Sequence, residues 1–84
     1  MKTDELASGL DAIGIPEALY IVNDTAEYAW CIVADGETWE VFWMERGNKN
    51  DLETFASERQ ACMFLLGRLA YSQILAGLSW GGTP

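Results

Sequence analysis

The sequence contains no histidine, so it lacks the side chain that most often serves as a catalytic base, a proton shuttle or a zinc ligand. Two cysteines cannot assemble a tetrahedral metal site by themselves. A phosphate-binding loop is also missing, because the glycines at 77, 81 and 82 follow a predicted helix, whereas such a loop precedes one. Glu37 and Glu40 follow a predicted turn, where solvated charge is a simpler interpretation than acid–base chemistry. We therefore expect a protein that is not an enzyme, with no catalytic residue, no metal and no cofactor.

Cysteines are few, and long hydrophobic runs are missing. Cys31 and Cys62 are far apart in the sequence and cannot form the dense disulfide framework of a small secreted domain. Residues 1–14 are acidic and lack the apolar core of a signal peptide. The uncharged apolar stretch of residues 69–80 is well short of the roughly 20 residues that a membrane span needs. These features predict a soluble, cytoplasmic protein with free thiols.

Basic side chains are also few: five Lys and Arg stand against 13 Asp and Glu, which gives a net charge of −8. Ten of the acidic residues lie between Thr3 and Glu45, where there is no Lys or Arg, and no charged residue follows Arg68. A surface this acidic repels nucleic acids and anionic membranes and attracts a basic protein. The alternative is that the acidity only keeps a small protein in solution. We expect a basic protein partner, and neither nucleic acid nor membrane as a partner.

The first element predicted by the sequence is a helix over residues 4–13. Leu6 and Leu10 are spaced as on one helix face, and Thr3 stands where an N-cap residue would. Gly14 suits the left-handed backbone with which many helices end.

Residues 18–45 predict a three-stranded antiparallel sheet, with a first strand over residues 18–23 and two further strands joined at Asp35-Gly36. A two-residue turn there pairs Ile32 with Trp39, and residues directly opposite share a face. One face then carries Tyr28, Trp30, Ile32, Trp39, Val41 and Trp43. The other carries Ala29, Cys31, Val33, Thr38, Glu40, Phe42 and Met44. The first is too apolar to be exposed and is expected to be core; the mixed second face is covered either by the N-terminal helix or by a partner.

Arg46 and Gly47 interrupt the last of these strands. Gly47 suits a left-handed or bulged backbone, followed by a loop over residues 48–51 and then by either a brief fourth strand or an extended connection. Arg46 either anchors a carboxylate of a partner or pairs with a nearby acid such as Glu45 or Asp51. The many local acids favour the pairing.

A long helix is predicted over residues 58–76, followed by a tail over residues 77–84. Ser57 and Gln60 have the spacing of a capping box at its start. One apolar stripe consists of Ala61, Cys62, Leu65, Leu66 and Leu69. A second apolar arc consists of Met63, Phe64, Tyr71, Ile74 and Leu75. A helix that is apolar on two sides must be covered on both, so the sheet covers one and the N-terminal helix, a second copy or a partner covers the other.

Two segments of the chain resemble a small family of bacterial immunity proteins. Residues 39–49 read W-x-V-F-W-x-E-R-G-x-K, and residues 55–62 read F-x-S-E-x-x-A-C, followed by Leu65-Leu66. The segment G-I-P-E at residues 14–17 and Tyr20 also fit. Members of this family are encoded beside polymorphic toxins, including those of contact-dependent inhibition. The resemblance implies a non-catalytic inhibitor that binds a cognate toxin domain in the cytosol.

The whole chain, residues 1–84, is thus expected to be one α+β domain that neutralises a bacterial toxin, with a basic nuclease as the partner that its acidity suits. Two alternatives are an acidic inhibitor that mimics phosphates against a nucleic-acid-binding protein, and a small dimeric structural module. The predicted partner-binding residues are Asp35, Glu37, Glu40, Phe42 and Met44. The residues predicted for a dimer or partner surface are Tyr71, Ile74, Leu75, Leu78 and Trp80.

Overall fold

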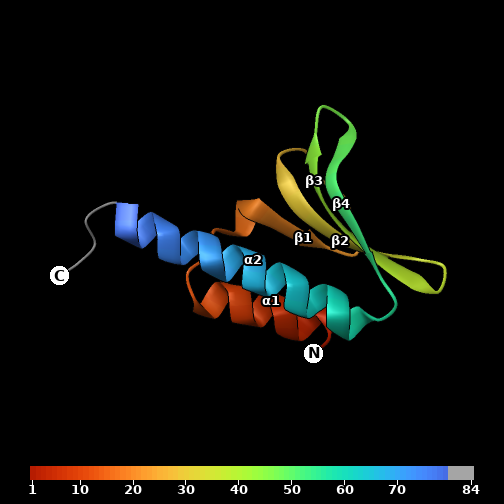
Figure 1. Cartoon of the computed structure of the whole chain (residues 1–84), viewed down its shortest axis with the longest axis horizontal. Coiled ribbons are helices and arrows are strands. Elements are labelled where there is room, and N and C mark those ends of the chain that lie inside the picture. The colour runs from red at the N-terminus through yellow and green to blue at the C-terminus, as the bar shows by residue number, and fades with distance from the viewer. Residues whose placement is uncertain (80–84) are drawn as a thin grey trace.

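The structure, a computed structural model, describes the backbone of residues 1–79 and the side chains of residues 1–76. Its elements follow in the order α1 (Thr3–Ala12), η1 (Glu17–Leu19), β1 (Tyr20–Val22), β2 (Ala29–Asp35), β3 (Thr38–Glu45), β4 (Asn48–Phe55) and α2 (Glu58–Ser79). The strands form one sheet in the order β1-β2-β3-β4, and the two helices form a second layer (Figure 1). The predicted α+β class is confirmed.

The N-terminus of α1 is held by carboxylates. Glu5 accepts a hydrogen bond from the Lys2 backbone N–H at 2.8 Å, and Glu58 at the start of α2 accepts one from the Thr3 N–H at 2.9 Å. Such N–H groups have no partner inside the helix, and negative charge there is favourable. Thr3 therefore belongs to the first turn and is not the cap. At the other end Gly14 has a φ of 85°, and the Ile15 N–H returns to the Leu10 carbonyl at 3.0 Å.

The β2–β3 hairpin has the predicted faces but a different turn. The turn is Gly36-Glu37 rather than Asp35-Gly36, so each residue of β2 pairs two positions further along β3 than predicted, as Ile32 does with Val41. A shift of two residues keeps every side chain on its face, whereas a shift of one would invert them all. Gly36 has a φ of 62° at the first turn position, where a type II′ turn prefers glycine.

β1 runs parallel to β2, so the predicted antiparallel pairing of the first strand is wrong. Tyr20 pairs with Trp30, and residues 23–28 return the chain to the start of β2. Parallel neighbours usually need a crossover of about a dozen residues. β1 has only three residues, so the chain must travel back only about 10 Å. Asn23 and Tyr28, at the two ends of the connection, have φ values of 60° and 57° that reverse the chain sharply.

β4 extends the sheet beyond β3, so the predicted loop over residues 48–51 is wrong and the alternative of a fourth strand is confirmed. Arg46 and Gly47 form the hairpin turn, and both have the positive φ, 53° and 75°, that a type I′ turn requires. A bulge opposite Phe42 interrupts the pairing, and Asp51 there has a φ of 53°.

The core lies between the sheet and the two helices. Its buried residues are Leu6, Leu10, Ile15, Ile32, Val41, Ala61, Cys62, Leu65 and Leu69. Trp30 and Trp39 are half-buried against it, which confirms the prediction that this face of the sheet is core. Tyr28 was assigned to the same face, but it precedes β2 and its side chain is 55% exposed. We call this face of the sheet the covered face.

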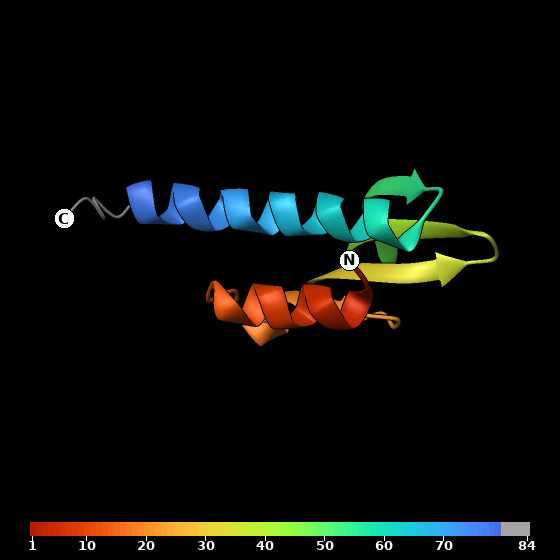
Figure 2. The same ribbon diagram turned by 90° about the horizontal axis from the view of Figure 1, so that it is seen from below.

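The predicted capping box at the start of α2 is present in part, because the Gln60 side chain reaches back to the Ala56 N–H and not to that of Ser57. Ser57 Oγ accepts from the Gln60 N–H at 3.2 Å, and Gln60 Oε1 accepts from the Ala56 N–H at 3.2 Å. The helix continues past its predicted end at residue 76 to Ser79. Figure 2 shows α1 alongside α2, which extends beyond the end of α1. Gly14, just after α1, lies close to Gln73 of α2. The contact between the two helices therefore extends along α2 as far as residue 73.

Candidate functional site

The residues predicted to bind a partner lie on the β2–β3 hairpin and the face of the sheet that points away from the helices. We call this the open face; its residues on β1, β2 and β3 are Ile21, Ala29, Cys31, Val33, Thr38, Glu40, Phe42 and Met44. Asp35 and Glu37 are exposed at the turn, and Thr38 Oγ1 donates to the Asp35 carbonyl at 3.0 Å. This turn stands at one end of the long axis of the molecule (Figure 1).

Glu40 forms an ion pair within the protein. Lys49 Nζ on β4 lies 2.7 Å from Glu40 Oε1, and the Glu40 side chain is only 14% exposed. The hydrogen bond with Glu40 raises the pKa of Lys49. The charge of Glu40 is therefore already matched, and the prediction of Glu40 as a free carboxylate for a partner needs correction.

Phe42 is fully buried, with an exposed fraction of 0%. Lys49 Nζ lies 4.9 Å from the centroid of its ring, a cation–π contact across the open face. A partner cannot reach this ring in the described conformation, so the prediction of Phe42 as an exposed apolar anchor is wrong. Met44 is half-buried and keeps part of its side chain at the surface.

Cys31 is buried beside Phe42 on the open face, so two of its apolar side chains pack together outside the main core. Burial raises the pKa of the Cys31 thiol, and the Asp24 and Glu27 carboxylates raise it further, although a backbone hydrogen bond at Ala26 acts in the opposite direction. A thiol held in its protonated form is a poor nucleophile. Both cysteines are free and buried, as the sequence predicted.

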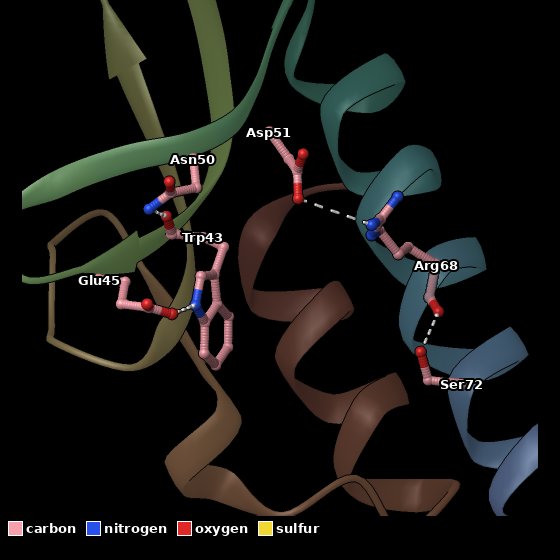
Figure 3. A network of polar contacts seen from close by, with 6 residues as sticks. All are labelled: Trp43, Glu45, Asn50, Asp51, Arg68 and Ser72. Atoms are coloured by element: carbon pink, nitrogen blue, oxygen red, sulfur yellow. Dashed lines mark hydrogen bonds and ion pairs between the residues drawn. The ribbon is translucent and has the colours of Figure 1, made fainter.

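An aromatic and charged cluster joins the covered face to α2, and Figure 3 shows the part of it formed by Trp43, Glu45, Asp51 and Arg68. Trp30 and Trp43 meet edge to face with ring centroids 5.9 Å apart, and the Arg68 guanidinium lies 4.7 Å from the Trp30 ring. Arg68 also approaches Asp51 at 4.0 Å, while Trp43 Nε1 donates to Glu45 at 3.0 Å. Sequence reasoning missed this cluster, although Arg68 is the last charged side chain in the sequence and stands between apolar residues of α2. The charged, polar and aromatic side chains of this cluster are partners of one another, which favours a structural role for the cluster.

Arg46 is exposed at the β3–β4 turn and makes no ion pair with the described residues. The carboxylate of Glu45 is engaged by Trp43 instead, so the favoured pairing of Arg46 with a nearby acid is not observed. The turn is held by Glu27, whose oxygens accept from the Gly47 N–H at 3.1 and 3.2 Å. A strained exposed arginine is therefore available to a partner at this end of the sheet.

The second predicted surface is on α2. Tyr71, Ile74 and Leu75 are 62%, 60% and 43% exposed. The side chain of Leu78, and Trp80 as a whole, lie outside the described residues.

The described residues include no group of three or more His, Cys, Asp or Glu side chains placed to hold a metal ion. Over the same residues, every buried side-chain nitrogen and oxygen has a hydrogen-bond partner. None of the helices within residues 1–79 is long and apolar enough to cross a membrane. Comparison with family models, with curated proteins and with solved structures finds no match for the chain. The resemblance to immunity proteins therefore rests on its sequence motifs.

Proposed function

We propose that this protein is a non-catalytic binding protein of the cytoplasm that neutralises a basic partner, in the way that an immunity protein neutralises a bacterial toxin domain. The observation that carries the proposal is the open face: neither helix covers it, it retains half-buried apolar side chains, and an exposed acidic turn adjoins it. A nuclease is the class of toxin that such a surface suits best, because a nuclease carries basic residues for its own substrate.

The charges support a basic partner. Ten carboxylates precede Arg46, and the only basic residue before that point is Lys2. On the open face Lys49 is paired with Glu40, so this pair adds little net charge beside Asp35 and Glu37. Such a field steers a basic protein toward the surface and raises the association rate.

The packing of the open face supports a preformed binding surface. Phe42 and Cys31 are already buried under their neighbours, so binding does not need to order them. Val33 and Met44 remain half-buried and offer apolar contact beside the acidic turn. Apolar contacts surrounded by polar groups are the usual anatomy of a specific protein interface.

The test begins with capture of a partner from the native cell by the wild-type chain, followed by measurement of the association rate against salt concentration. The double variant Asp35→Lys, Glu37→Lys is expected to slow association about tenfold or more and to flatten its salt dependence. The matched control, Asp11→Lys, Glu17→Lys, makes the same change of charge on α1 and η1, away from the β2–β3 turn (Figure 1). Equal effects of the two double variants would contradict the assignment of the surface. A partner that DNA or RNA displaces from the wild-type chain would favour the phosphate-mimicking alternative.

A further inference from the structure

α2 carries a second apolar surface on the side that faces away from the core. Met63, Tyr71 and Ile74 are 52%, 62% and 60% exposed, and Gly67 lies between them. Their spacing places these four residues on one side of the helix, opposite Leu65 and Leu69 in the core. We call these four residues the outer stripe.

No described element covers the outer stripe. α1 was one of the predicted covers, but it lies along a different side of α2, where Leu6 and Leu10 join the main core. In Figure 2, α1 runs along one side of α2, and its opposite side is open apart from the end of β4 near the first turn. Apolar side chains that gather on one exposed face are a feature by which binding sites are recognised.

We propose that the outer stripe binds a second copy of this chain, with the two α2 helices antiparallel about a two-fold axis. A two-fold interface requires that the surface be complementary to itself. An axis midway between Gly67 and Tyr71 places each Tyr71 over the Gly67 of the other copy, and each Ile74 beside the other Met63. Gly67 offers the necessary space, because nothing lies within 4 Å of the position that a side chain would occupy. The stripe therefore has a bulky group and a matching gap in symmetric positions.

The charges favour a second copy over the basic partner at this surface. The outer stripe contains no carboxylate, and α2 contains no charge after Arg68, so a basic protein finds nothing there to pair with. Two copies with a net charge of −8 repel each other over most of their surface, and the outer stripe is where they can approach with least repulsion.

The antiparallel arrangement also matches the two ends of α2. The last turn of α2 contains no basic residue, although the carbonyl groups there carry partial negative charge. In the proposed dimer this end lies beside Arg59 of the other copy, which is exposed and makes no ion pair with the described residues. Arg59 lines an open hollow of about 600 Å³ with Phe55, Met63 and Phe64, so the far end of the partner helix finds space there.

The size of the stripe predicts a dimer that dissociates. The outer stripe spans 12 residues from Met63 to Ile74, about 18 Å of a helix about 10 Å wide, which gives a face of roughly 180 Å². A standard interface buries about 800 Å² per partner. Added salt is expected to strengthen the dimer, because it screens the repulsion between two acidic copies. This trend is opposite to that expected for the basic partner on the open face.

Sedimentation equilibrium between about 1 μM and 1 mM covers the affinities that a small interface allows. The wild-type chain is expected to shift from monomer to dimer over this range, and more readily at high salt. Gly67→Glu is expected to weaken the dimer about tenfold or more, because it places a charge in the contact while the isolated helix gains a better helix former. Ser8→Glu adds the same charge at an exposed position of α1 and is expected to dimerise as the wild type does. A wild-type monomer at every concentration, or equal behaviour of the two variants, would overturn the proposal.

Cross-linking tests the orientation of the helices. Gly67→Cys and Tyr71→Cys are prepared as separate proteins and oxidised alone and mixed, and the native cysteines do not compete because both are buried. The antiparallel dimer predicts a disulfide mainly in the mixture, because only positions 67 and 71 of different copies come within bonding distance. Cross-links that form equally well within each single variant would indicate parallel helices and would refute the proposed axis.

Discussion

The two faces of the sheet bury their apolar side chains by different means. The covered face buries Ile32 and Val41 beneath the leucines of two helices, whereas the open face buries Phe42 and Cys31 with no helix above them. Neighbouring strands, a lysine and the connection before β2 provide the cover there. The sheet is strongly twisted (Figure 1), and twist brings such neighbours closer together. A side chain can therefore be buried without a second layer, and the remainder of the open face stays free to bind.

The largest expected effects come from truncating one buried residue on each side of the sheet. Leu65→Ala on the covered side is expected to lower the free energy of unfolding by about 4 kcal/mol, and Phe42→Ala on the open side by about 3 kcal/mol. Both side chains are 0% exposed, but the space left by Phe42 adjoins solvent and can be filled by water or by the Lys49 side chain. Urea unfolding at neutral pH measures both. A loss below about 1 kcal/mol for Phe42→Ala would show that the open face has no packed cluster.

A smaller effect concerns the two thiols, one of which is buried on each side of the sheet: Cys31 on the open face and Cys62 on α2, in the main core. Burial raises the pKa of Cys31 and of Cys62, so the folded protein holds both thiols protonated. An unfolded chain ionises its thiols near pH 8.5, and the free energy of unfolding is therefore expected to fall as the pH rises above that value. Below it, the full contribution of both groups is present. Urea unfolding across neutral and alkaline pH, compared with the double variant Cys31→Ala, Cys62→Ala, isolates this component.

The rate of alkylation then compares the two faces directly. Both thiols are expected to react much more slowly in the native protein than in urea. Fast labelling of Cys31 with slow labelling of Cys62 would mean that the open face exposes its interior more often than the covered face does.

The smallest effect concerns Lys49, which crosses the open face. Lys49→Met keeps an unbranched side chain above Phe42 but removes the ion pair with Glu40, whereas Lys49→Ala removes both. Because exposed ion pairs contribute little, the melting temperature is expected to fall only slightly for the Met variant and further for the Ala variant. Thermal unfolding at two salt concentrations measures this. Equal decreases in melting temperature for the two variants would mean that Lys49 protects Phe42 through its charge alone and not through its unbranched side chain.

The helices and the covered face could be predicted from the sequence because the spacing of their apolar residues allows only one arrangement in which those residues are buried. The hairpin turn was misplaced because Asp35-Gly36 and Gly36-Glu37 both satisfy the need for glycine and give the same two faces. β4 was difficult to recognise because its residues are exposed on both sides, so no alternation of apolar and polar residues marks it as a strand. The direction of β1 depends on a short connection whose path no local pattern specifies.

The candidate site was predicted only in part because β4 was not recognised as a strand. Asp35 and Glu37 are exposed, as expected of residues at a turn. The partner of Glu40 could not be identified, because Lys49 reaches it only once β4 is part of the sheet. The burial of Phe42 followed from the same missing strand. Because the polar strand β4 was not recognised, the interpretation of Glu40 and Phe42, two of the five predicted partner-binding residues, had to be corrected.

The capping of α1 by Glu58 links the beginning of the chain to a segment that is synthesised late. The β2–β3 hairpin can form within microseconds of its last residue becoming free, but Trp30 and Trp39 then lack the helix that shields them. At about 5–20 residues per second, translation needs about 1–5 s to proceed from the end of β3 to Leu69. During that interval a nascent chain presents its tryptophans to the surrounding cell, and the Thr3 N–H at the start of α1 lacks its Glu58 partner. This small domain thus depends on its final helix for completion, and a chaperone that recognises aromatic surfaces has a defined period in which to act.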